Sequence, residues 1–439
     1  MQRISRREFV KRTAVTGAAF TSLPAFLAAC GTSTSTSNKP SKLVVAAVQG
    51  NEDGPLKKVV GNYKTQTGIE VQVVEFPYDS LYSKLVTTFQ ANDSSYDLCM
   101  MDDPWMPKFG TMGALQALDS YGFTRDSDIP TVVYDVGTWP PPHGPVPPSE
   151  QGKTQHLYGI TIVGNVEMFM YRSDKSSAPT SWDDVLTNAA KYNAANFYGY
   201  VIRGKATNPV SSDSLPILWS FGGNVFDDNW KVQLDSDASI TAVDFLTRKL
   251  KKYAEPGAES FDAAERSQAM ATGKAYQSTV WPGEITGIVE DPTVSQVRGK
   301  VAYIPIPQGP SGKGLGMMGN WLLGIPKGSK NGSAAADFIK WMLKPDKMRN
   351  YVAQGGIPIR NSILNDASLA SANPYFKALA SSFAAVPNWR PRTDQWGAVE
   401  TSYGTAMNAA VAGLLTPAAA MQKAAGEIRT LMKAANYPS

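Results

Sequence analysis

Short apolar runs alternate with helical patterns in the first sixty residues after Lys42. One run, 43–48, is continuously apolar, as buried strands are, and apolar residues alternate with polar ones over 69–73. The pattern predicts strands at 43–48, 69–73 and 98–101 and helices at 56–67 and 81–89. Gly68 follows the first helical pattern, at the position where glycine commonly ends a helix. This order of elements predicts a parallel or mixed sheet that is covered by helices.

Similar units recur in the second half of the chain. Residues 240–250 carry an apolar helical face, and 301–304 and 321–325 are strand-like runs. Thr416 and Pro417 supply an N-cap and a first-turn proline for a final helix. Because a single hydrophobic core stops growing at about 250–300 residues, a chain of 439 residues is expected to form two lobes.

One segment fits neither pattern. Residues 139–148 include six prolines, and proline removes backbone donors and fixes its own φ. We therefore expect a rigid, extended surface loop over 139–148.

The N-terminal segment predicts export. Arg6 and Arg7 lie in a short polar head, and the apolar stretch 14–26 that follows is too short to span a bilayer. Residues 1–29 are therefore expected to be a twin-arginine-like signal peptide. Leu27-Ala28-Ala29-Cys30 is typical of a lipoprotein cleavage site, so Cys30 is the expected lipidated residue. With Cys30, residues 30–41, rich in Ser and Thr, would form a flexible tether.

Charge and cysteine content change the picture once this segment is removed. Of the 42 basic and 38 acidic residues, five and one lie in the first 29 positions, so the remainder is electrically balanced. The chain therefore gives no electrostatic reason to expect binding to nucleic acid. Cys99 is the only other cysteine, which excludes an intramolecular disulfide, and its apolar run predicts a buried strand residue.

The residues needed for common enzyme chemistry are scarce. The two histidines, His143 and His156, are too few for an ordinary zinc site, and no Gly-x-Ser-x-Gly elbow occurs. The glycine pattern at 314–319 precedes a strand instead of opening a helix, which argues against a dinucleotide site. Asp102 and Asp103 are adjacent on an extended segment, so their side chains are expected on opposite faces. We therefore expect no catalysis, no metal and no cofactor.

Seven of the ten tryptophans fall into two groups. Trp182, Trp219 and Trp341 lie inside helical patterns and are expected to pack in the core. Four others lie at the ends of expected strands or in loops: Trp105, Trp281, Trp321 and Trp396. A tryptophan ring offers a flat apolar face and one N–H donor, which suits the apolar face and hydroxyl rim of a sugar.

The chain resembles the family 1 extracellular solute-binding proteins of carbohydrate-type ABC importers. The matching stretches are Thr67–Val71, Tyr96–Leu98 with Asp102–Trp105, Leu157–Ile160, Met170–Arg172, Thr180–Asp183, Ser220–Gly223, Gly273–Ala275 with Trp281, and Gly356–Arg360. The resemblance implies a two-lobed periplasmic-binding-protein-like α/β fold with hinge strands and a ligand cleft between the lobes. Similarity to the maltose-binding type implies crossings near Ile160, Pro307 and Pro358. The first lobe would then comprise 42–160 and 308–357, and the second 161–307 and 358–439. The proline-rich segment is not a feature of that family that we recognise.

The same resemblance implies capture of a sugar, oligosaccharide or polyol for delivery to the permease subunits of an importer. We expect a monomer outside the cytoplasm, attached to the membrane through its lipid only. Ligands of open α/β sheets bind beyond the carboxyl ends of the strands. The expected ligand-binding residues are Gln49, Asn51, Glu52, Asp102, Asp103, Trp105, Asn165, Trp281, Asn320, Trp321, Arg392 and Trp396. Trp281 is expected to matter most and a half-exposed Asp103 next. A surface-tethered protein that binds or degrades glycans, and a scaffold or chemoreceptor partner, remain open alternatives.

Overall fold

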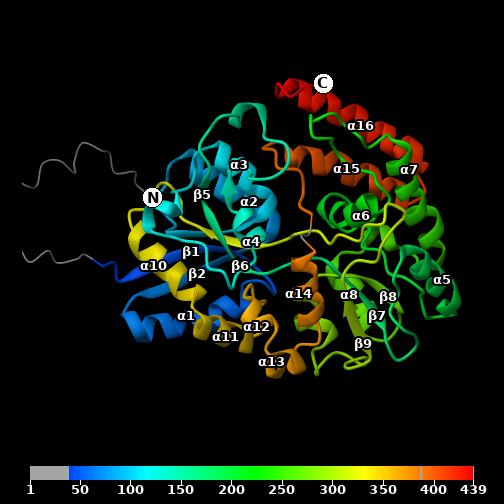
Figure 1. Cartoon of the computed structure of the whole chain (residues 1–439), viewed down its shortest axis with the longest axis horizontal. Helices are drawn as coiled ribbons and strands as arrows, with labels where there is room; N and C mark the ends of the chain where they lie inside the picture. The colour runs from blue at the N-terminus through cyan, green and yellow to red at the C-terminus, as the bar shows by residue number, and fades with distance from the viewer. Residues whose placement is uncertain (1–38, 386–387, 439) are drawn as a thin grey trace, which may run out of the picture. The chain divides into compact units, whose positions relative to one another are not determined.

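A five-stranded sheet forms the centre of one half of the folded chain. The computed structural model describes residues 39–385 and 388–438, so Cys30 and the expected signal peptide lie outside the described residues. The sheet has the order β2-β1-β3-β10-β6, formed by β2 (Glu70–Phe76), β1 (Lys42–Val48), β3 (Leu98–Asp102), β10 (Trp321–Gly324) and β6 (Gly159–Val163). Of these strands, β1, β2 and β6 are labelled in Figure 1. β1 pairs in parallel with β2 and β3, whereas β10 runs antiparallel to β3 and β6. The prediction of a mixed sheet is therefore confirmed.

A smaller sheet forms the centre of the other half. It has the order β8-β7-β9, formed by β8 (Gln277–Val280), β7 (Met168–Arg172) and β9 (Val301–Ile304). Both partners pair with β7 in the antiparallel sense. A short hairpin-like pair, β4 (Thr138–Trp139) with β5 (His156–Leu157), flanks the proline-rich segment. The strands expected at 301–304 and near 321–325 are confirmed.

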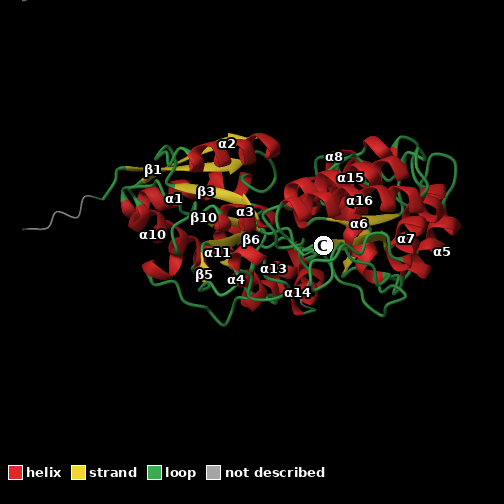
Figure 2. Cartoon of the chain, turned by 90° about the horizontal axis from the view of Figure 1, so that it is seen from above, coloured by secondary structure: helices red, strands yellow, loops and turns green. Residues whose placement is uncertain are grey.

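Helices surround both sheets (Figure 2). Those of the first half are α1 (Gly54–Thr67), α2 (Tyr78–Gln90), α3 (Met106–Thr111), α4 (Thr131–Asp135), α10 (Gly332–Leu343) and α11 (Pro345–Ala353). The others are α5 (Trp182–Tyr192), α6 (Asn208–Ser220), α7 (Asp237–Asp244), α8 (Ala263–Ala271), α9 (Pro282–Glu284), α12 (Asn361–Leu364), α13 (Ala367–Ala372), α14 (Phe376–Ala384), α15 (Trp396–Val411) and α16 (Pro417–Ala434). The helices α15 and α16 pack on each other and on α6 and α7, which gives the second half a core of its own.

Local signals in the sequence account for several boundaries. Gly68 ends α1 with φ of 77°, a left-handed conformation that favours glycine. Thr416 caps α16 by accepting a hydrogen bond from the Ala419 N–H, with Pro417 at the first helical position. Cys99 is fully buried in β3, and burial raises the pKa of its thiol. Trp182, Trp219 and Trp341 are buried in the core, as predicted.

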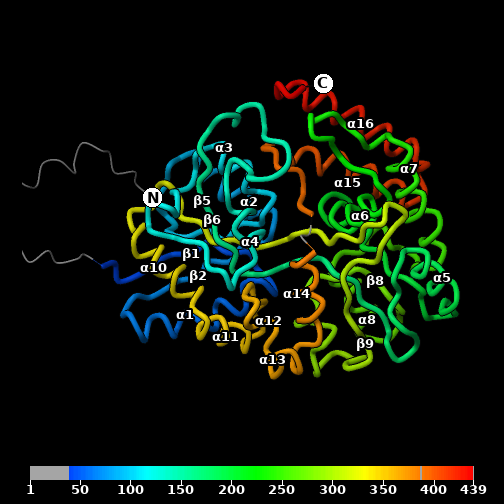
Figure 3. The backbone as a smooth tube through the Cα atoms, in the orientation of Figure 1, coloured from blue at the N-terminus to red at the C-terminus, as the bar shows by residue number. Residues whose placement is uncertain are grey.

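Segments that connect the two sheets lie side by side in the middle of the molecule (Figure 3). The Gly164 N–H donates to the Ile357 carbonyl, and Val166 pairs with Met318. Met317 pairs in turn with Asn388, at the start of the segment that leads to α15. Stretches that are far apart in sequence therefore meet where the chain passes from one sheet to the other.

The proline-rich segment is more buried than expected. Trp139 is 2 % exposed, and its indole Nε1 lies 3.2 Å from Glu150 Oε2. Further along, the Val146 carbonyl accepts a hydrogen bond from Trp230 Nε1 at 3.2 Å. The prediction of a surface loop is thus only partly right, because Trp139 and Val146 anchor the segment near its two ends and only its middle, at His143 and Gly144, is exposed.

Candidate functional site

The carboxyl ends of β1 and β3 lie at the same edge of the first sheet, because these strands are parallel neighbours. Asn51 and Glu52 follow β1, and Asp102 ends β3. This edge is where open α/β sheets bind ligands.

Arg390 joins the two aspartates at the end of β3. Its Nη2 lies 3.0 Å from Asp102 Oδ1 and 3.2 Å from Asp103 Oδ1, and all three residues are buried. Burial by itself would lower the pKa of Arg390, but the two carboxylates raise it. Burial raises the pKa of Asp103 to about 6, against the effect of Arg390. The guanidinium therefore holds two carboxylates together in a region with little water.

Two of our expectations about these aspartates are wrong. Asp102 and Asp103 do not diverge, because β3 ends at Asp102 and a 3₁₀ turn, η2 (Asp103–Trp105), begins at once. Asp103 is fully buried rather than half exposed, and its Oδ2 accepts a hydrogen bond from the Asn320 N–H at 3.0 Å. It is part of the framework of the site.

A tyrosine and a glutamate extend this cluster. The Tyr78 hydroxyl donates to Asp102 Oδ2 at 2.8 Å, and burial followed by the charge of Asp102 raises the pKa of Tyr78. Glu400 of α15 accepts a hydrogen bond from Asn208 Nδ2 at 3.0 Å. Burial raises the pKa of Glu400 to about 7, although Arg390 opposes the shift. Side chains from α2, β3, α6 and α15 thus converge.

Trp281 reaches this region from the second sheet. It follows β8 directly, and a Cβ placed on Gly319 would lie 2.5 Å from its Cζ3 atom. The ring therefore lies against the backbone just before β10, and only glycine leaves room for it there.

The loop after β1 also meets the turn that follows Trp281. A Cβ on Gly287 would lie 2.8 Å from the Asn51 amide, and one on Gly283 would lie 3.4 Å from Glu52 Oε1. Burial raises the pKa of Glu52 to about 7, and the nearby carboxylates of Glu284, Asp102 and Asp53 add to the effect. The two halves are therefore in contact at Asn51 and Glu52.

Asn165 and Asn320 hold each other near the crossing. The Asn165 N–H donates to Asn320 Oδ1 at 2.8 Å, and the Gly319 N–H donates to the Asn165 carbonyl. Asn320 Nδ2 and Asn165 Oδ1 are buried and have no hydrogen-bond partner among the described residues. A buried amide without a partner is costly, so these atoms are suited to pair with a polar ligand or with water.

The remaining predicted residues lie around this centre in different settings. Arg392 donates to the carbonyls of Asp103 and Val136, at 2.9 and 2.6 Å. Trp105 and Trp321 are buried and pack edge to face, with ring centroids 5.6 Å apart. Trp396 is 2 % exposed and belongs to the core of the second half, whereas Gln49 is exposed.

Sequence reasoning missed four residues of this region: Tyr78, Asn208, Arg390 and Glu400. Arg390 carried a weak signal, because it lies two positions before the predicted Arg392. No local pattern marks Glu400, which lies on an ordinary helix and becomes part of the site only through folding.

The family model described as "Bacterial extracellular solute-binding protein" matches residues 47–349. The chain belongs to this family. Its members are binding proteins, so this solute-binding protein is not an enzyme. A curated relative from Sinorhizobium fredii, named "Probable amino-acid ABC transporter periplasmic-binding protein", is 25% identical over 418 residues and covers 90% of each chain.

Solved structures have the same fold as this solute-binding protein. An ABC transporter solute-binding protein from Agrobacterium radiobacter K84, in complex with ribitol, has a TM-score of 0.79 and 23% identity and covers 90% of this chain and 99% of its own. The maltose-bound MalE3 of T. maritima has a TM-score of 0.77 and 25% identity and covers 89% and 99%. The two-lobed periplasmic-binding-protein-like fold is therefore confirmed.

Residues 39–385 and 388–438 include no helix with the length and apolarity to cross a membrane. The same stretches hold no group of three or more His, Cys, Asp or Glu side chains arranged to bind a metal ion.

Proposed function

We propose that the protein captures a sugar, oligosaccharide or polyol outside the cytoplasm and delivers it to an ABC importer. The observation that carries the proposal is Trp281, which follows β8 and whose ring lies against Gly319, next to Asn320, whose Nδ2 has no hydrogen-bond partner among the described residues. An aromatic face opposite hydrogen-bonding side chains suits a ligand that has apolar C–H faces and a rim of hydroxyls.

The similar structures bound to ribitol and maltose support this ligand class, since both ligands are polyhydroxylated and uncharged. The relative from S. fredii is named for amino acids, which carry a carboxylate and an ammonium group. Arg390 pairs with the side-chain carboxylates of both Asp102 and Asp103. An incoming carboxylate would have to compete with them, which favours an uncharged ligand.

Capture would proceed by closure of two lobes, 42–160 with 308–357 and 161–307 with 358–439. A ligand that contacts both lobes favours the closed form, in which the importer's permease subunits would recognise the protein. The contact of Glu52 with Gly283 supports closure along this edge. The ligand groups would come from the predicted set, with Trp281 and Asn320 foremost.

A thermal-shift screen of residues 39–439 tests the proposal. Ribitol, D-mannitol, maltose and glucose would be compared with a panel of amino acids at equal concentrations. A ligand at 100 times its Kd stabilises the protein by about 2.7 kcal/mol. Stabilisation by a polyol or sugar is the expected result. Stabilisation by amino acids alone would overturn the ligand class, and hydrolysis of a glycan would contradict a pure binding role.

We also propose that Cys30 carries the lipid that anchors the protein to a bacterial membrane. Basic head, apolar stretch and Leu27-Ala28-Ala29-Cys30 support export followed by lipidation. The Cys30→Ala variant is expected to leave the membrane fraction or to accumulate as an uncleaved precursor, with Cys99→Ala as the control. A Cys30→Ala protein that is processed and stays in the membrane fraction would contradict the anchor.

A further inference from the structure

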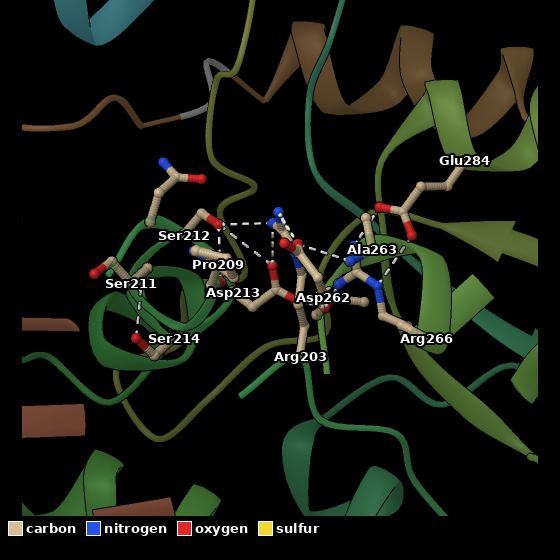
Figure 4. A network of polar contacts seen from close by, with 12 residues as sticks. Arg203, Pro209, Ser211, Ser212, Asp213, Ser214, Asp262, Ala263, Arg266 and Glu284 are labelled. Carbon is tan, nitrogen blue, oxygen red and sulfur yellow. Dashed lines mark hydrogen bonds and ion pairs between the residues drawn. The ribbon is translucent and has the colours of Figure 1, made fainter. Parts of the chain in front are cut away.

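One guanidinium is hydrogen-bonded to residues on both sides of Trp281. Thr279 lies two positions before Trp281 and Glu284 three positions after it. Arg266 of α8 donates from Nη1 to Thr279 Oγ1 at 2.9 Å and from Nε to Glu284 Oε2 at 3.1 Å. Its Nη2 also binds the second oxygen of Glu284 (Figure 4). The side chains of one residue before and one residue after Trp281 are thus held by one guanidinium.

We infer that Arg266 is a positioning residue for ligand binding, which fixes Trp281 and the turn at α9 in the place where they face the first lobe. This inference rests on the proposed function and deepens it. Arg266 is fully buried and acts only through the residues that it holds.

The charges around Arg266 explain why an arginine stands at this position. Asp213 of α6 and Glu284 both pair with it, and Asp213 Oδ2 also accepts a hydrogen bond from Thr279 Oγ1 at 3.0 Å. Burial would lower the pKa of Arg266, but these carboxylates raise it. Only a planar fork with several donors can bind Glu284 with two nitrogens and still reach Thr279 and Asp213. A lysine keeps the charge but loses this geometry.

Trp281 has little tolerance for displacement. Its ring lies against Gly319, so a shift towards the first lobe would collide with backbone, and a shift away would lose the contact. The turn after Trp281 brings Gly283 against Glu52. Arg266 also neutralises Glu284, which otherwise would place a second unpaired carboxylate near Glu52. The position of Trp281 and the charge of Glu284 near Glu52 therefore both depend on Arg266.

Arg203 provides a matched comparison within the same polar network (Figure 4). Its hydrogen bonds go to Asp262, Ser212 and Asp213, at 3.0, 3.0 and 3.3 Å. None of these residues flanks Trp281 in the sequence. Replacing either arginine with lysine weakens the network, but only the change at Arg266 releases the segment 279–284.

The experiment uses fluorine NMR of protein labelled with 5-fluorotryptophan. The resonance of Trp281 is assigned by its disappearance in Trp281→Phe. We expect Arg266→Lys to shift or broaden this resonance, whereas Arg203→Lys leaves it in place even if both variants lower Tm. An unchanged Trp281 resonance in Arg266→Lys would overturn the inference, as would an equal change in Arg203→Lys.

Calorimetry with ribitol and with maltose adds a functional readout. Arg266→Lys is expected to weaken binding about tenfold, or about 1.4 kcal/mol, while Arg203→Lys stays close to the parent. If the parent binds neither compound, these ligands are wrong but the fluorine resonance still tests the positioning role. If the parent binds and Arg266→Lys binds equally well, the positioning role is wrong and the proposed function stands.

Two milder variants keep the test informative if Arg266→Lys does not fold. Thr279→Val removes the hydrogen bond from Arg266 to the residue before Trp281. Glu284→Gln weakens the ion pair between Arg266 and the residue after Trp281. The ion pair between Arg266 and Asp213 remains in both variants. Each is expected to move the Trp281 resonance by part of the full effect. Two folded variants with the parental resonance would contradict the inference.

Discussion

Arg390 Nη2 and Asp102 Oδ1 lie 3.0 Å apart, although 288 positions separate the two residues in the chain. The same nitrogen lies 3.2 Å from Asp103 Oδ1. The pair joins the segment before α15 to the end of β3, the place where strand-end residues gather. It therefore ties the late part of the chain to the framework of the candidate site.

Replacing Arg390 is expected to destabilise the protein strongly. Arg390→Gln would leave two buried carboxylates without their cation, and breaking a buried pair in this way typically costs about 3–5 kcal/mol. Denaturant unfolding measures the change. Arg429→Gln is the control, because Arg429 pairs with Asp235 at the surface, where such pairs are worth about 0–1 kcal/mol. Equal losses in the two variants would contradict the framework role of Arg390.

Trp281→Ala is expected to weaken binding of the best compound from the screen by about thirtyfold, because truncating a large aromatic anchor often costs 2 kcal/mol or more. Isothermal calorimetry measures the affinity, after a melt has shown that the variant unfolds cooperatively. Trp341→Phe, at a buried position of α10 that packs against Tyr63 of α1, controls for loss of core packing. Affinity within a factor of two of the parent would mean that Trp281 serves packing alone.

Sequence patterns predicted the elements that depend on near neighbours. The alternation at 69–73, the glycine after α1 and the apolar run around Cys99 each specify their own structure, since strand burial and helix caps are local properties. The Asp102-Asp103 expectation failed because it assumed that the strand continued. Asp102 as a cap and Pro104 in the first turn were local signals of the 3₁₀ turn. The arrival of Arg390, 288 positions later in the chain, has no such signal.

The site could be predicted only in outline. Asp102 and Glu52 could be predicted as site residues from the ends of the expected strands, because topology decides which edge of a parallel sheet carries the carboxyl ends. Arg390, Glu400 and Arg266 become informative only through contacts with residues distant in sequence, and such contacts leave no periodic trace. The proline-rich segment shows the same limit: its stiffness was predictable, but its contact with Trp230 was not.

The hydrogen bond between this segment and Trp230 is expected to contribute about 1 kcal/mol to stability. Trp230→Phe keeps an aromatic ring beside Tyr437, whose ring centroid lies 5.0 Å away, but removes the donor to the Val146 carbonyl. Trp182→Phe is the matched control, because Trp182 Nε1 has no hydrogen-bond partner among the described residues. Thermal unfolding should separate the two variants by this amount. A larger loss in Trp182→Phe would argue that packing, and not the hydrogen bond, decides the effect.

Glu52 is expected to make the closed form depend on pH. Burial, with Glu284, Asp102 and Asp53 nearby, raises its pKa to about 7 from an ordinary 4.5. When the lobes separate, water returns to the carboxylate and its pKa falls back towards the ordinary value. Between about pH 4.5 and 7, closure is therefore accompanied by uptake of a proton at Glu52. The protonated Glu52 stabilises the closed form fully below this range, and this stabilisation is lost as the pH rises through about 7.

Small-angle scattering of the ligand-free protein at pH 5 and pH 8 tests this dependence. We expect a smaller radius of gyration at pH 5, and the difference should largely disappear in Glu52→Gln, which keeps the shape of the side chain without its charge. Glu400 has a pKa raised to about 7 by burial as well, so Glu400→Gln is the necessary comparison. A pH effect that survives Glu52→Gln and disappears in Glu400→Gln would assign the proton to α15 instead of the loop after β1.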